Sequence, residues 1–215
     1  MALHADARDW TLRTAHNRDE MWALADEEGI REARLAYPSG WLFLTRDAAT
    51  RELVRLAAAT GGEWGADELA HELDQSPESF ERSLDDLVEL AVFREEDGAY
   101  RPNSESVVAQ TAERLRVTAD EYGAEDGFRD IASPESVRLM LDALLSIDSD
   151  DELTQDDLHE LVGLSRKSEW MHVERLTNLG VLVESGDSYV IDESSPVFGN
   201  VRALNAAVLG TALSP

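Results

Sequence analysis

The stretch TQDDLHELVGLSRKSEWMHVERLTNLGVLVESGDSYVID, residues 154–192, contains the pattern that decides the fold. A short segment ends at Gly163, and Ser165, a residue type that caps helices, opens the next segment. Apolar residues then recur at the spacing of one helix face, at Val173, Leu176 and Leu179. Two strand-like runs follow, separated by Gly186-Asp187. The stretch therefore predicts two helices joined by a tight turn and followed by a β-hairpin.

The same pattern occurs 89 residues earlier, where residues 65–107 align without a gap with residues 154–196. Leu69 aligns with Leu158, and Tyr100 aligns with Tyr189. Further upstream the offset is 87, and the two-residue difference falls in polar turns, where insertions are tolerated. The sequence therefore contains a duplicated domain.

Each copy is predicted to form three helices and a hairpin. In the first copy we expect helices over 47–59 and 66–73, and a third that begins at Ser76-Pro77. The hairpin turns at Asp97-Gly98. The third helix of the first copy has Phe80 at a buried position, where the second copy has Glu169. Either Trp170 takes over this packing or Glu169 lies at a partly solvated edge. The predicted class is α+β, mostly α with small β wings.

Residues 154–192 resemble the winged helix-turn-helix domains of archaeal and bacterial transcription regulators. The resemblance rests on Thr-x-x-x-Leu-x-x-x-x-Gly-Leu-Ser, then a helix ending Leu-x-x-Leu-Gly-Val, then a wing. It implies two tandem winged helix-turn-helix domains with flanking helices. The expected divisions are an N-terminal extension at 1–44, a first domain at 45–122, a linker at 123–134 and a second domain at 135–215.

The composition is strongly acidic, with 45 acidic and 19 basic residues and a formal net charge of −26. Lys167 is the single lysine. This acid excess with scarce lysine resembles the proteins of haloarchaea that accumulate salt. The alternative is an acidic protein that avoids nucleic acid. In molar salt the screening length falls to about 3 Å, so net charge does not exclude DNA as a partner.

Several classes of function find no support in the sequence. Cysteine is absent, which excludes disulfides and thiolate metal sites, and the histidines lack metal-site spacing. No nucleophile or phosphate-loop motif is present, so we expect neither an enzyme, nor a cofactor, nor a metal. The sequence shows no apolar run long enough for a membrane span and no signal peptide at the N-terminus, so we expect a cytoplasmic protein without membrane contact.

The candidate DNA-binding residues lie on the third helix of the second copy, where scarce cations gather. They are Arg166, Lys167, Ser168, Trp170, Met171, His172 and Arg175. Such residue types contact phosphates and base edges, while the alternative is an ordinary solvated helix. The third helix of the first copy has Arg82 alone among acids, so we expect that domain to contact protein or to support the second copy.

The flanking segments give further expectations. Residues 17–37 predict one helix, and GWLFLT, residues 40–45, is a strand candidate. The last helix carries an apolar stripe that either packs on the body or pairs with a second chain. The candidate contact residues are Val197, Phe198, Val201, Leu204 and Val208. Regulators of the resembled class dimerise through such helices, so we expect a homodimer.

Two functions follow from these patterns. The first is a sequence-specific regulator that binds double-stranded DNA through the second domain. The second is a tandem winged-helix adaptor without direct DNA binding, resembling condensin-accessory subunits or ESCRT-II, in which an acidic face of the first domain docks a protein partner.

Overall fold

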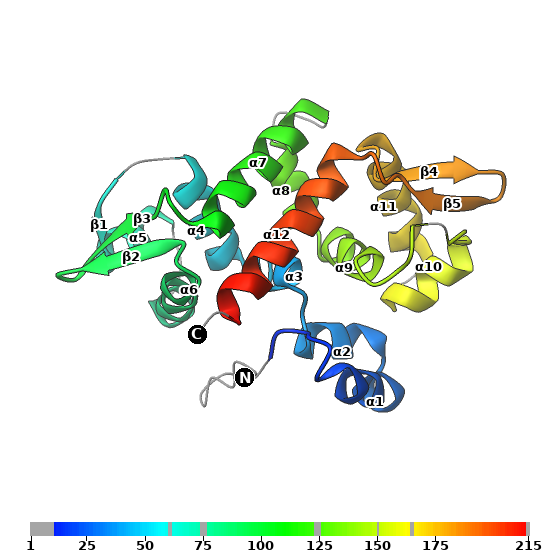
Figure 1. The fold of residues 1–215 in the computed structure, drawn as a ribbon, viewed down its shortest axis with the longest axis horizontal. Coiled ribbons are helices and arrows are strands. Elements are labelled where there is room, and N and C mark those ends of the chain that lie inside the picture. The colour runs from blue at the N-terminus through cyan, green and yellow to red at the C-terminus, as the bar shows by residue number, and fades with distance from the viewer. Residues whose placement is uncertain are drawn as a thin grey trace.

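The computed structural model describes residues 11–59, 62–73, 77–122, 126–149, 151–163 and 166–213; within these ranges the side chains of 59, 72, 77–79 and 166–171 are not described. The described chain is mostly helical, with short antiparallel strands in two small sheets (Figure 1). The expected α+β class is therefore confirmed. No helix in the described ranges is both long and apolar enough to cross a bilayer.

The N-terminal segment forms three helices, α1 (Arg18–Glu28), α2 (Ile30–Ala36) and α3 (Gly40–Leu44). The single helix expected over 17–37 is broken at Gly29, whose φ of 99° is incompatible with a continuous helix. The strand expected at GWLFLT is wrong: α3 is helical, and Ser39 caps it by accepting a hydrogen bond from the Leu42 amide. All of α3 is buried, and a short apolar run gives no periodicity that separates strand from helix.

The first half of the molecule, which begins with α3 and ends at Tyr122, contains four more helices and three short strands within its described residues. They are α4 (Ala48–Ala59), β1 (Trp64–Gly65), α5 (Ala66–Glu72), α6 (Pro77–Glu89), β2 (Phe93–Glu96), β3 (Ala99–Pro102) and α7 (Val107–Tyr122). The expected helices and hairpin of the first copy lie at these places. The hairpin turns at Asp97 and Gly98, both with positive φ, as the expected two-residue turn requires.

The second half contains five helices and a hairpin among its described residues. They are α8 (Gly127–Ala132), α9 (Glu135–Leu144), α10 (Gln155–Val162), α11 (Arg166–Asn178), β4 (Leu182–Ser185), β5 (Ser188–Ile191) and α12 (Pro196–Ala212). The order of elements from α9 to α12 follows that from α4 to α7.

Equivalent residues of the two halves, 89 positions apart in sequence, form equivalent backbone pairs. Trp64 pairs antiparallel with Tyr100 in the first half. Leu153 forms an antiparallel bridge with Tyr189 in the second half. Both members of the second pair lie 89 residues after their counterparts in the first. The two halves therefore share register as well as element order.

The linker expected at 123–134 contains a buried helix. Residues 123–125 lie outside the described chain, but 127–132 form α8, with Phe128, Ile131 and Ala132 buried in the core. Asp126 caps α8 by accepting a hydrogen bond from the Arg129 amide. Asp126 and Gly127 thus form a helix start within the expected linker.

Two short helices pack across the halves in a reciprocal way. With an offset of 87 residues in the sequence, Gly40 at the start of α3 aligns with Gly127 at the start of α8. A Cβ on Gly40 would lie 2.7 Å from the Cβ of Val208 in α12, and a Cβ on Gly127 would overlap the Ala119 carbonyl in α7. Val208 is itself 89 residues after Ala119. Each short helix thus meets the trailing helix of the other half.

The trailing helices α7 and α12 pack against each other between the two halves, with the hairpins at opposite ends of the molecule (Figure 1). Their buried faces are equivalent under the 89-residue offset: Val108, Ala109, Ala112, Leu115 and Ala119 in α7, and Val197, Phe198, Val201, Leu204 and Val208 in α12. The halves are therefore arranged about the α7–α12 pair as the subunits of a two-fold dimer are arranged about their interface.

Candidate nucleic-acid interface

Helix α10 begins and ends at well-defined caps, and these position α11. Thr154 accepts a hydrogen bond from the Asp157 amide, and the Asp157 carboxylate accepts one from the Thr154 amide in return. This is a reciprocal capping box. At the other end Gly163 ends α10 in the left-handed conformation, with a φ of 67°, which favours glycine. The chain thus leaves α10 sharply before α11 begins.

One face of α11 packs into the second half. Val173, Leu176 and Leu179 are almost fully buried, and α11 contacts α9, α10 and β4. On the opposite side Glu174 and Asn178 are exposed. In the described chain, α11 therefore has an inner face that holds it in place and an outer face open to solvent.

His172, one of the expected DNA-contact residues, lies on the inner face. It is only 9% exposed, and its Nδ1 has no hydrogen-bond partner among the described residues. Burial, aided by the nearby charge of Arg175, lowers the pKa of the imidazole, which favours the neutral form. The assignment of His172 to DNA contact is thus corrected: the ring packs against the protein.

Arg175 is committed to a contact within the chain. It is half-buried, and its Nη1 donates a hydrogen bond of 3.0 Å to the carbonyl oxygen of Asp130 in α8. The residue 89 positions earlier, Asp86, is also turned inward and is 1% exposed. The guanidinium of Arg175 thus joins α11 to α8, which disfavours the expected DNA contact of this residue.

The other five expected DNA-contact residues lie in the first turns of α11. The backbone of α11 includes Arg166, Lys167, Ser168, Trp170 and Met171, but their side chains lie outside the described part of the structure. The alternatives for Glu169 and Trp170 fall in the same segment, and the expected cap Ser165 precedes the described residues.

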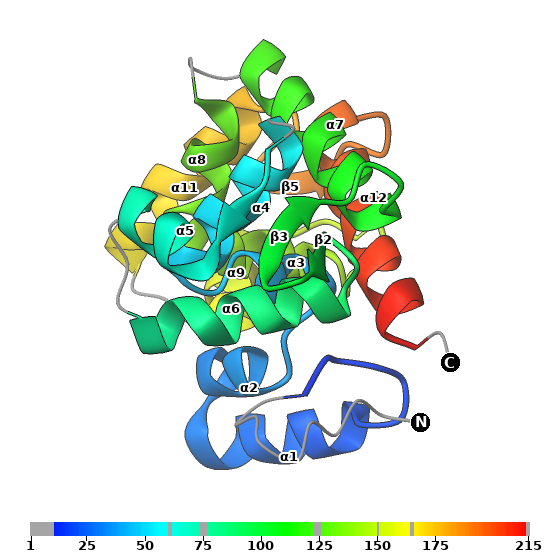
Figure 2. The same cartoon turned by 90° about the vertical axis from the view of Figure 1, so that its left-hand side faces the viewer.

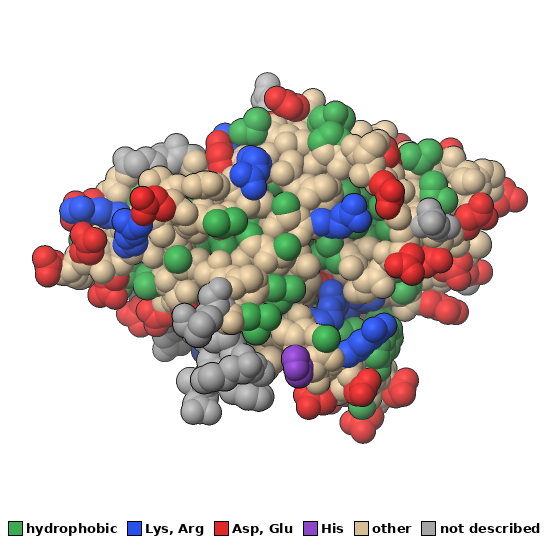
Figure 3. Space-filling view, viewed as in Figure 1, with side chains coloured by type: hydrophobic (Ala, Val, Ile, Leu, Met, Phe, Trp, Pro, Cys, Tyr) green, Lys and Arg blue, Asp and Glu red, His purple; other side chains and the backbone are tan. Residues whose placement is uncertain are grey.

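The hairpin β4–β5 beside α11 is not basic. Its exposed side chains include Val183, Glu184 and Asp187. Acidic side chains gather at both ends of the face drawn in Figure 3 and are sparser at its centre. The described side chains of the hairpin thus offer no cation beside α11.

The first half presents an acidic counterpart of α11. Along the outer face of α6, Glu81, Asp85 and Glu89 are exposed together with Arg82. In the adjoining hairpin Arg94 is ion-paired with Glu105 at 2.5 Å, and Arg101 is ion-paired with Glu63 at 2.7 Å. Among the described side chains on the outer face of α6, Arg82 is the one cation. The excess of carboxylates on this face disfavours contact with phosphates.

The five residues assigned to a contact with a second chain are buried inside this one. Val197, Phe198, Val201, Leu204 and Val208 are each at most 2% exposed, covered by α7 and α3. The assignment of this stripe to a dimer interface is therefore corrected. The apolar face of α12 packs against the equivalent helix α7. The sequence analysis did not predict this pairing.

A buried ionic cluster joins the N-terminal segment to the second half and was not expected. Asp142 in α9 is fully buried, and its carboxylate accepts hydrogen bonds from Arg13, from Arg34 and from the Ser39 amide. Arg34 also donates to the Leu161 carbonyl of α10 at 2.9 Å. The sequence signal was an aspartate inside the apolar run RLMLDALL, residues 138–145, because an acid on a buried helix face requires a partner. Arg13, Arg34 and Ser39 consequently join the N-terminal segment to α9 and α10 of the second half.

No group of three or more histidine, aspartate or glutamate side chains in the described ranges is arranged to hold a metal ion.

Comparisons with known proteins identify no family and one distantly similar solved structure. No family model matches the sequence, and no curated protein matches it. Among solved structures, the DIP2311 protein of Corynebacterium diphtheriae is similar at 16% sequence identity, with a TM-score of 0.23. The match covers 85% of this chain and 30% of that chain, so this chain spans less than a third of its neighbour's length. A TM-score this low does not establish a shared fold.

Proposed function

We propose that the protein is a DNA-binding transcription regulator of a halophilic archaeon, with two winged helix-turn-helix domains in one chain. The observation that carries the proposal is the order of α10, the Gly163 turn, α11 and the hairpin β4–β5. In this order α11 is held by Val173 and Leu176 and keeps an uncovered outer face at Glu174 and Asn178. A helix held in this way can enter a major groove.

The symmetry of the two halves bears on the oligomeric state of such a regulator, since the acidic α6 face of the first half disfavours a second DNA contact. Winged-helix regulators commonly act as two-fold dimers, because DNA half-sites are related by a two-fold axis. Here the α7–α12 pair occupies the place of a dimer interface within one chain. In Figure 2, α11 lies to the left and α12 to the right. Glu174 and Asn178 are exposed, so the outer face of α11 is open at these residues. A homodimer through the α12 stripe is then unnecessary.

Charge determines how such a regulator would bind. A net charge of −26 opposes any duplex at low salt. Molar salt removes this long-range repulsion together with most of the affinity gained by counterion release. Binding would rest on short-range contacts, for which Arg166 and Lys167 are the proposed groups.

The proposal is tested by selecting binding sites from a random duplex library in molar potassium chloride. Enrichment of one sequence by the wild-type chain, lost in the Arg166→Ala, Lys167→Ala double variant, supports it. Arg82→Ala, on the outer face of α6, is the matched control and should leave the enriched sequence unchanged.

A second candidate is a protein-interaction adaptor, favoured by the exposed carboxylates of Glu81, Asp85 and Glu89 on α6. Such a face would dock a basic partner. A pull-down from lysate at native salt tests it: stoichiometric recovery of one protein without enriched DNA would favour the adaptor, and the Glu81→Gln, Asp85→Asn double variant should then lose that protein.

A further inference from the structure

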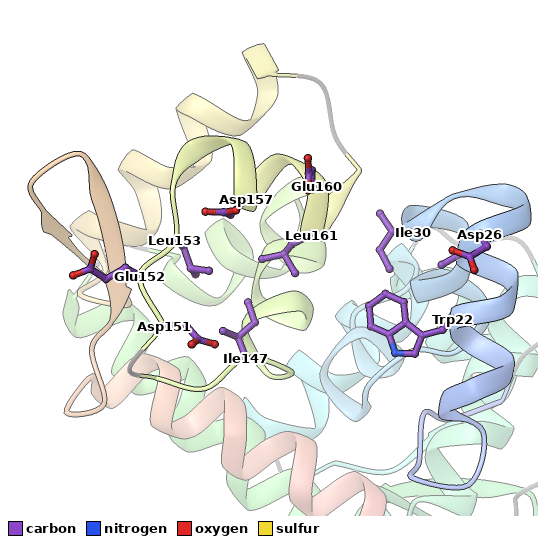
Figure 4. Close-up of a pocket in the computed structure, with 11 residues that line it drawn as sticks. Trp22, Asp26, Ile30, Ile147, Asp151, Glu152, Leu153, Asp157, Glu160 and Leu161 are labelled. Carbon is purple, nitrogen blue, oxygen red and sulfur yellow. The ribbon is translucent and has the colours of Figure 1, made fainter.

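A groove of about 550 Å³ lies between the N-terminal helices and the second half (Figure 4). One wall comes from α1 and α2 and includes Trp22 and Ile30. The facing wall comes from α10 and the segment that precedes it, and includes Ile147 and Leu161. The volume is within the range of small-molecule sites, roughly 300–1,000 Å³.

Trp22 stands on one wall with its indole directed across the groove (Figure 4). It is 44% exposed, whereas Trp41 is fully buried and Trp64 is partly buried. The opposite wall is apolar, with Leu153 buried and Ile147 and Leu161 partly buried. A flat or apolar group between these walls would remove an exposed indole from water.

The rim of the groove is acidic. Asp26, Asp151, Glu152 and Glu160 line it, and in the described chain their carboxylates form no hydrogen bond or ion pair. The fifth acid, Asp157, is occupied by the amide and hydroxyl of Thr154. Among the described residues that line the groove there is no lysine, arginine or histidine.

We propose that this groove binds an organic cation of drug-like size with an aromatic or apolar body. A cation is attracted to the indole face and to the rim carboxylates, and its body is covered by the apolar walls. Anions, including nucleic acid, are repelled by the rim.

Salt distinguishes this ligand from an inorganic cation. In molar salt, attraction beyond about 3 Å is screened, so contact interactions dominate. A hydrated sodium or potassium ion gains nothing from the apolar walls, while an organic cation gains from both the walls and the indole. Carboxylates occur over much of this surface, but here they surround an apolar cleft that contains an exposed tryptophan.

The test uses tetraphenylphosphonium and tetraphenylborate, a cation and an anion of nearly the same shape. Binding to the full chain is measured by titration calorimetry in molar sodium chloride. We expect one tetraphenylphosphonium per chain and no binding of tetraphenylborate. Trp22→Ala should weaken binding about ten-fold, and Glu160→Gln and Asp26→Asn about three-fold each, as partly exposed cation–π and ionic contacts would.

Two variants on α7 serve as controls. Tyr122→Ala removes an aromatic ring that is 49% exposed, and Glu121→Gln removes an exposed carboxylate; neither lines the groove. Both should bind the cation as the wild type does, and circular dichroism confirms that each variant is folded.

Three results would overturn the inference. Equal binding of the two ions would show that the site does not select charge. Unchanged binding by Trp22→Ala would place the cation elsewhere. Binding of a basic peptide without binding of tetraphenylphosphonium would make the groove a peptide-docking surface. The inference does not rest on DNA binding, because every measurement uses protein and ion alone.

Discussion

Arg34 donates a hydrogen bond of 2.8 Å to the carboxylate of Asp142, although 108 residues separate the two in sequence. Both side chains are at most 1% exposed. Arg13 donates two further bonds of 2.9 Å to the same carboxylate. Burial alone would raise the pKa of Asp142, but the charges of Arg13 and Arg34 outweigh it and hold the pKa below its ordinary value. The N-terminal helices are thus attached to α9 by a paired buried charge.

Asp142→Asn should destabilise the protein by about 3–5 kcal/mol, because it leaves the buried Arg34 without its charged partner. Chemical denaturation at neutral pH measures the loss. The double variant Arg34→Met, Asp142→Leu should lose less than Asp142→Asn, since apolar replacement of both partners leaves no unpaired charge at Arg34. Arg13 is 14% exposed and can reach water in that variant. If Asp142→Asn lowers the free energy of unfolding by less than about 1 kcal/mol, the cluster contributes little to stability.

The lowered pKa of Asp142 also predicts acid sensitivity. The ion pair contributes its full stability above the pKa of an unfolded aspartate, about 3.9. That contribution is lost as pH falls through the lower pKa of the folded state. The free energy of unfolding of Asp142→Asn should therefore fall less steeply below about pH 4 than that of the wild type. Parallel curves for the two proteins would contradict the lowered pKa.

Gly127→Ala should destabilise the chain by about 1–3 kcal/mol, because the added Cβ would overlap the Ala119 carbonyl and force α8 from α7. Gly199→Ala in α12 is the matched control, since nothing lies within 4 Å of its added Cβ. There the change should stabilise the helix by about 0.5–1 kcal/mol. Thermal unfolding of the two variants measures the difference. Equal unfolding temperatures for Gly127→Ala and Gly199→Ala would show that α8 does not approach α7 closely.

His172 predicts a second pH dependence. Burial and the charge of Arg175 lower its folded pKa, so protonation favours the unfolded state. Stability should be constant above the ordinary histidine pKa, near 6.5, and should decrease as pH falls through the lower folded pKa. His172→Gln should remove this decrease, as unfolding at pH 7 and pH 5 would show. If the variant retains the full decrease, another group is responsible.

The sequence predicted the helices and hairpins wherever periodicity and caps coincide. Leu69 and Leu158, aligned by the repeat, are both fully buried. Short buried helices were missed, because α3 and α8 are too brief to show a period. The inward position of His172 was missed because apolar spacing fixes the centre of a buried face and leaves its edges undefined.

Arg175 was assigned to DNA for its charge, whereas its partner is a backbone carbonyl 45 residues earlier, which leaves no side-chain signal in the sequence. The pairing of α12 with α7 could have been inferred from the 89-residue offset, because their apolar stripes are equivalent. Charge gathered on a helix therefore predicts a binding face only after the inward residues have been separated from the outward ones.

The proposed reading of DNA by α11 is tested most directly by fluorescence anisotropy on the selected duplex in molar potassium chloride, comparing two variants. Arg166→Ala, Lys167→Ala should lower affinity at least ten-fold, because two base or phosphate contacts of about 1 kcal/mol or more are lost. Arg175→Ala should change affinity less than three-fold while lowering the unfolding temperature, because its guanidinium holds α8. A duplex bound equally well by the wild type and the double variant would contradict the account.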